Sequence, residues 1–219
     1  MLSAHLIKEF ADRTVLPIDL NEVTALLLQK KYQDEINFIP VDLDTGVIRG
    51  FLKRYRRPKG GWDSEPDDVS NIYYDQSQGA DWINLVCAKE LLHILDAARC
   101  STKEQFEKLT ESLALPTDMK HLLTDPDFAL VDKFGSAHAA ALLLPKAARD
   151  LLMPAYESGV LTVANIAEMA LMPAQHVRMV MGPNWDGIYR VIMAPIETKA
   201  NEPEFDLSAT HAPIANGAH

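Results

Sequence analysis

The sequence has little cysteine: only two of its 219 residues are cysteines, Cys87 and Cys100. If both lie on one helix they are about 20 Å apart at ~1.5 Å per residue, which is too far for a disulfide. The N-terminal stretch carries Lys8, Glu9 and Asp12, so it does not read as a secretory signal. Two unpaired thiols and no signal predict a protein of the reducing cytoplasm.

Long hydrophobic runs and surplus positive charge are also missing. The longest unbroken apolar run covers 139–145, far short of the roughly 20 residues of a spanning helix, so we expect no membrane span. Acidic residues outnumber basic ones 31 to 21, giving a net charge of −10, which argues against a general affinity for nucleic-acid phosphates. The sequence contains neither a Gly-rich phosphate loop nor a Gly-x-Ser-x-Gly elbow.

What is present is the composition of a globular protein, with 47% hydrophobic and 24% charged residues. Aromatic residues make up only 7%, so the core is expected to be mostly aliphatic. The length favours one domain, which we place at residues 1–195. Residues 196–219 are rich in Pro, Asn, Ala and Gly and predict a disordered acidic and polar tail.

The periodicity of apolar residues predicts an α+β fold that is mostly helical. Two helices are expected first, then a small antiparallel sheet of three short strands, then helices to the end of the domain. The helices are expected at 3–13, 19–34, 81–98, from 101, from 116, 127–144, 163–171 and 174–181, and the strands at 36–39, 47–55 and 71–75.

One segment of the third helix carries a recognisable chemical pattern. Zinc peptidases use His-Glu-x-x-His, in which two imidazoles one turn apart hold the metal and the Glu polarises the attacking water. This chain instead reads Lys89-Glu90-Leu91-Leu92-His93. The Glu and the second His are present, and the first His is replaced by lysine.

Four segments in order make the chain resemble the ImmA/IrrE-type metallopeptidases over about residues 18–181. These zincin-like cytoplasmic proteins are often linked to phage, mobile-element or stress regulation, and the resemblance implies a zincin-like fold. The segments are Asn71-Ile72-Tyr73-Tyr74-Asp75, Ala88-Lys89-Glu90-Leu91-Leu92-His93, Ala139-Ala140-Ala141-Leu142-Leu143-Leu144-Pro145 and the pair Ile166-Ala167-Glu168-Met169 with Val177-Arg178.

The resemblance implies the fold but not the activity, because two zinc ligands are missing. The family's third ligand is an acid on the second of its two site helices, which corresponds to the helix expected at 127–144 here. That position falls at about Phe134, with Asp132 two residues before it. An ammonium at Lys89 has no lone pair and repels a dication. We therefore expect no metal, a vestigial base in Glu90, and a Lys89 that replaces the zinc charge and pairs with a carboxylate such as Asp132. Only His93 stands in a ligand position.

Two alternative functions remain open from the sequence. A working zinc peptidase would need a rearranged ligand set of Glu90, His93 and His138, with Asp132 approaching it. The competing interpretation of His138 is a satisfied polar group in an Ala-rich helix.

The second alternative is a nucleic-acid-associated factor that acts through the basic segment 49–59. Basic residues interleaved with aromatic ones are typical of contact with a polyanion. The competing interpretation is a strand whose charges deter edge pairing or pair with the acidic loop 63–68. The basic residues in question are Arg49, Lys53, Arg54, Arg56 and Arg57.

The sequence thus favours a catalytically degenerate ImmA/IrrE-like protein. We expect it to act as a cytoplasmic regulatory protein that binds a protein partner and needs no cofactor. Zinc belongs only to the alternative of a working peptidase.

Overall fold

The computed structural model of the chain describes residues 2–30, 32, 34–46, 48–58, 67–95 and 126–197, including side chains except those of 126–134 and 197. Over these ranges the chain is α+β, as predicted, with eight helices and one three-stranded sheet. The helices predicted from 101 and 116 lie outside the described residues. So does the predicted tail 196–219, except for residues 196 and 197, which are helical. The elements are α1 (Leu2–Phe10), α2 (Leu20–Gln29), β1 (Glu35–Val41), β2 (Gly50–Arg57), β3 (Asp67–Asp75), α3 (Ala80–Leu95), α5 (Pro126–Leu143), α6 (Lys146–Glu157), α7 (Val163–Ala170), α8 (Ala174–Val180) and α9 (Trp185–Glu197).

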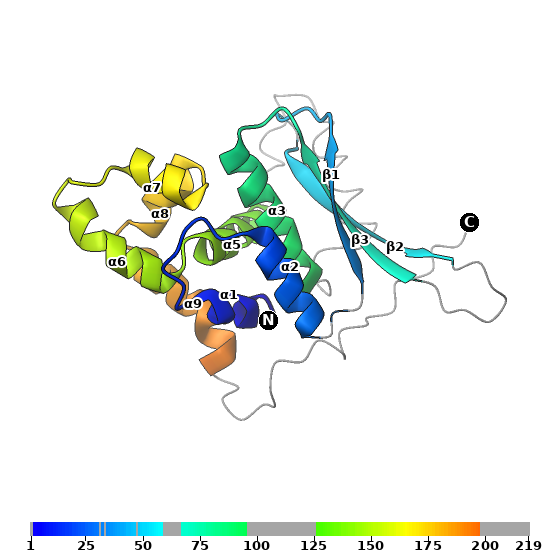
Figure 1. The fold of residues 1–219 in the computed structure, drawn as a ribbon, viewed down its shortest axis with the longest axis horizontal. Helices are drawn as coiled ribbons and strands as arrows, with labels where there is room; N and C mark the ends of the chain where they lie inside the picture. The colour runs from blue at the N-terminus through cyan, green and yellow to red at the C-terminus, as the bar shows by residue number, and fades with distance from the viewer. Residues whose placement is uncertain are drawn as a thin grey trace.

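The sheet lies at one side of the molecule, and the helices extend away from it (Figure 1). α2 and α3 lie nearest the sheet, α5 lies behind α3, and α6, α7 and α8 form the end farthest from the strands. No helix in the described part of the chain is long and apolar enough to cross a membrane.

The prediction of an antiparallel sheet is wrong for one of the two strand pairs. The strand order is β1-β3-β2, with β2 antiparallel to β3 but β1 parallel to it. The chain reverses direction between β1 and β2 and again between β2 and β3, so β3 runs the same way as β1. β3 takes the central position because its residues 69–72 are all buried, whereas β2 carries exposed cations that suit an edge.

One face of the sheet packs against α3 to form part of the core. Phe38, Leu52 and Ile72, one from each strand, lie side by side in register and belong to this core. Gly50, at the start of β2, lies so close to α3 that a Cβ there would clash with the Val86 side chain and would lie 2.6 Å from the Tyr73 carbonyl oxygen. The missing side chain therefore lets α3 rest directly on the sheet.

α5 is the central helix of the helical layer. Every residue from 139 to 144 is at most 2% exposed, and α1, α3, α8 and α9 all contact this helix. Over 137–143 its alanines let these neighbours approach closely, as expected of a helical segment that is buried on every side. The break predicted at Pro145 is confirmed, since α5 ends at Leu143 and α6 begins at Lys146.

The tight helix pair predicted after residue 163 is also confirmed as α7 and α8. Thr162 and Asn165 form a reciprocal capping box at the start of α7. α7 ends at Ala170, and its C-cap residue Leu171 has φ of 46° and so lies in the left-handed region. The Asn84 side chain donates a 3.1 Å hydrogen bond to the Leu171 carbonyl, which ties this turn to α3.

Candidate functional site at the junction of α3 and α5

The candidate site lies on α3, the helix that carries the Lys-Glu-x-x-His motif. α3 begins after Gly79, whose carbonyl accepts the N–H groups of Trp82 and Ile83 at 3.0 Å. Most of its following residues are buried against the sheet and α5. Lys89 and His93 are only partly buried, and they lie one turn apart on the same helix.

Both of these side chains lie against a single residue of α5, Gly135. A Cβ at Gly135 would lie 3.0 Å from His93 Nε2, 3.1 Å from His93 Cε1 and 3.3 Å from Lys89 Cγ. The expectation that Lys89 and His93 share one face of the helix is therefore confirmed. α3 and α5 approach so closely here because Gly135 has no side chain.

Lys89 forms an ion pair with Glu90, the next residue on its own helix. Lys89 Nζ lies 3.2 Å from Glu90 Oε1, and the two side chains are 19% and 9% exposed. The carboxylate that would serve as general base in a zinc peptidase is thus held by an ammonium. Asp132, the partner proposed from the sequence, belongs to α5, but its side chain lies outside the described part of the chain.

The other predicted site residues lie on α5. Phe134, where the resemblance places an acidic ligand, belongs to this helix, and its side chain also lies outside the description. The next residue, Gly135, meets His93 and offers no donor atom. His138 follows three residues later and is a buried residue of α5, 4% exposed.

The described residues contain no group of three or more His, Cys, Asp or Glu side chains placed to hold a metal ion. The rearranged set of Glu90, His93 and His138 is therefore not brought together in this arrangement of α3 and α5.

Cys87 lies on the buried side of the same helix and is 3% exposed. Burial, with a smaller contribution from the Glu90 charge, raises the pKa of the Cys87 thiol to about 12. A thiol with this pKa is protonated at neutral pH, and a protonated thiol is a poor nucleophile. Cys87 is therefore a packing residue, as its place in the helix predicts.

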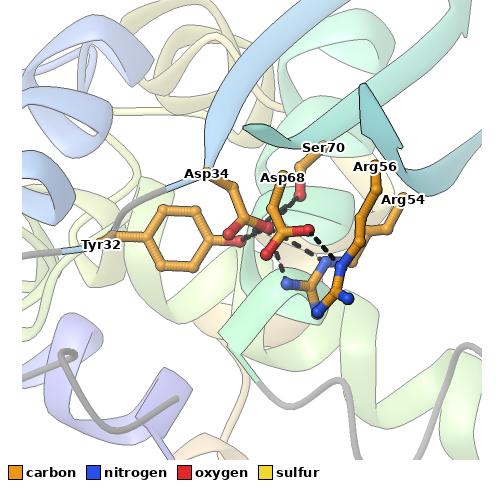
Figure 2. Close-up of polar contacts among 6 residues, drawn as sticks. All are labelled: Tyr32, Asp34, Arg54, Arg56, Asp68 and Ser70. Atoms are coloured by element: carbon orange, nitrogen blue, oxygen red, sulfur yellow. Dashed lines mark hydrogen bonds and ion pairs between the residues drawn. The ribbon is translucent and has the colours of Figure 1, made fainter. Parts of the chain in front are cut away.

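The four arginines of the basic segment are already engaged by neighbouring side chains. Figure 2 shows that Arg54, Tyr32 and Ser70 all point toward Asp34. Asp34 Oδ2 accepts hydrogen bonds from Arg54 Nη2 at 2.7 Å, from the Tyr32 hydroxyl at 2.9 Å and from the Ser70 hydroxyl at 3.1 Å. Burial raises the pKa of the Tyr32 phenol more than the nearby Arg54 charge lowers it, so the phenol stays protonated and donates.

Arg56 and Arg57 pair with carboxylates at the edge of the same cluster. Arg56 Nε lies 3.1 Å from Asp68, which Figure 2 also shows. Arg57 Nη2 lies 2.6 Å from Glu35 and 3.5 Å from Asp67. Asp67 and Asp68 belong to the acidic stretch 63–68, so pairing with that stretch, one of the competing interpretations, occurs at these two arginines.

The first two cations of the segment differ from the rest. The Arg49 guanidinium lies 4.0 Å above the Trp82 ring and donates to Gln78 Oε1 at 3.2 Å. Lys53 is exposed on β2. Lys53 is thus the cation of this strand that is most accessible to a polyanion.

Two important parts of these sites were not identified from the sequence. Gly135 has a usable signal, because a single glycine inside a helical pattern commonly marks a close packing contact. Asp34 has no such sequence signal, because an acidic residue before a strand normally indicates a solvated turn. Its burial at 1% exposure depends on Arg54 and Ser70, which are distant in sequence.

Comparison with known proteins gives no relative on which to rest an assignment: no family model, no curated protein and no solved structure matches the chain.

Proposed function

We propose that this protein is a catalytically inactive relative of the ImmA/IrrE-type metallopeptidases that acts in regulation by binding a protein partner. The observation that carries the proposal is the Lys89–Glu90 ion pair in the middle of the motif helix. A lysine replaces the first zinc ligand, and its ammonium engages the carboxylate that a peptidase needs free to activate water. The fixed positive charge takes the place of the metal ion.

The contact at Gly135 supports the same proposal from the opposite helix. A zincin-like site needs a third ligand on the helix that faces the two histidines, and at Gly135 the α5 backbone itself lies against His93 and Lys89. Close packing of α3 on α5 replaces coordination as the interaction between the two helices. The cytoplasmic location and the zincin-like fold belong to this proposal as well.

Elemental analysis of the full chain, purified without chelator or affinity tag, tests the proposal. We expect much less than one zinc per chain, and a His93→Ala variant should have the same metal content as wild type. About one zinc per chain that is lost on His93→Ala would support the working peptidase instead. Glu90→Gln provides an independent check, since peptidase activity that this change removes would overturn the proposal.

A further inference from the structure

A shallow cavity of about 450 Å³, largely open to solvent, lies at the surface between α6 and α9, and no residue of α3 or α5 lines it. Its volume falls within the range of roughly 300–1,000 Å³ that is usual for small-molecule sites. Lys146, Arg149 and Asp150 line the α6 side, and the α9 side includes Asp186 and Arg190.

Arg149 is a buried charged residue at the wall of this cavity. Its side chain is 9% exposed. Its Nε donates to the Val180 carbonyl at 2.7 Å, and its Nη1 lies 3.1 Å from Asp186 Oδ1. The guanidinium is therefore held in place by the end of α8 and the first turn of α9, so a ligand would meet a preorganised group.

The charges of the lining leave one cation in excess. Lys146 is paired with Asp150, and Arg149 is paired with Asp186. Arg190 is the third cation and is exposed. Two carboxylates thus face three cations in a chain whose net charge is −10, and a single excess charge suits a monoanion better than a dianion.

The same cavity has apolar surface beside these charges. Tyr189 and Met193, one turn apart on α9, complete its lining. Burial raises the pKa of the Tyr189 phenol, with smaller contributions from Asp12 and Asp150, so the ring is neutral. An aromatic ring and a thioether together favour a ligand with a flat or aliphatic body.

We propose that the cavity between α6 and α9 binds a small organic carboxylate. Its carboxylate group contacts Arg190 and the accessible edge of Arg149, and its apolar body lies on Tyr189 and Met193. The inference does not depend on the proposed function, because the two sites share no residue.

Titration of the full chain with benzoate, followed by NMR shifts or calorimetry, tests the proposal. We expect saturable binding that Arg190→Gln weakens by about tenfold, the loss expected for one charge-assisted hydrogen bond. Arg178→Gln, an equal charge change on the exposed side of α8, is the matched control and should leave the affinity unchanged. Benzyl alcohol, a neutral probe of similar shape, should bind much more weakly.

Several results would overturn the inference. They are the absence of saturable benzoate binding up to about 10 mM, equal affinity in Arg190→Gln and wild type, and tighter binding of benzylammonium or inorganic phosphate than of benzoate. None of these results bears on zinc content, so failure here is distinguishable from failure of the proposed function.

Discussion

Replacement of Lys89 by methionine measures how strongly the ion pair holds the motif helix. The change keeps the length and apolar stem of the side chain and removes the ammonium. Glu90, whose side chain is 9% exposed and lies 3.2 Å from Lys89, then loses this partner. Burial removes water from this carboxylate, and the ion pair with Lys89 offsets the cost of that lost hydration. Without the ammonium the cost is no longer offset.

The expected magnitude lies between two limits. Exposed ion pairs contribute about 0–1 kcal/mol, and removal of one partner of a fully buried pair costs about 3–5 kcal/mol. Lys89 keeps 19% of its side chain exposed, so solvent screens part of the interaction. We expect Lys89→Met to lower the free energy of unfolding by about 2 kcal/mol.

Urea denaturation at neutral pH gives the free energy from the midpoint and the slope. The double variant Lys89→Met/Glu90→Gln should be less destabilised than the sum of its single changes, since the uncompensated charge is gone. Lys8→Met, on the exposed side of α1, serves as the control and should unfold like wild type. A shift below about 0.5 kcal/mol for Lys89→Met, or strict additivity in the double variant, would refute the idea that Lys89 replaces the metal charge.

Two further predictions concern carboxylates on or beside the sheet. Asp34→Asn should lower the free energy of unfolding by about 3 kcal/mol, because it leaves the Arg54 guanidinium, 10% exposed, without its counter-ion. Denaturation measures this change, and a variant as stable as the exposed control Asp12→Asn would contradict it. Hydrogen bonds from Ser77 and from the Leu43 N–H hold the pKa of Asp75 below its usual value, so this carboxyl contributes stability above its unfolded-state pKa, and the contribution is lost as pH falls through its folded-state pKa. Asp75→Asn should therefore reduce the drop in urea midpoint between about pH 7 and about pH 3, and an unchanged drop would disprove the assignment.

Local features of the fold were predictable because their signals are local. Pro145 marks the end of one helix and the start of the next, and the β-rich stretch at 36–39 lies within β1. The direction of β1 relative to β3 was not predictable in this way. It depends on which strand occupies the centre of the sheet, and that is decided by pairing between residues far apart in the sequence.

In the candidate site, too, the local features were predictable from the sequence and the contacts between distant segments were not. Helical periodicity alone places Lys89 and His93 on one face, and the contact of both with Gly135 confirms it. Which residue of α5 would meet them depends on how the two helices cross, and an offset of one position separates Phe134 from Gly135. The pairing of Lys89 with Glu90 was missed because the sequence argument looked for a partner on another element.

The parallel pairing of β1 with β3 also has a consequence for the way the chain folds. β2 and β3 are consecutive antiparallel strands and can pair after closing a short loop, whereas β1 pairs with residues 34 positions later, as Glu35 does with Val69. Closing the longer loop costs more entropy. β1, which is synthesised first, is therefore expected to join the sheet last. Until then, the edge of β3 that pairs with β1 is open to pairing with a strand from another chain.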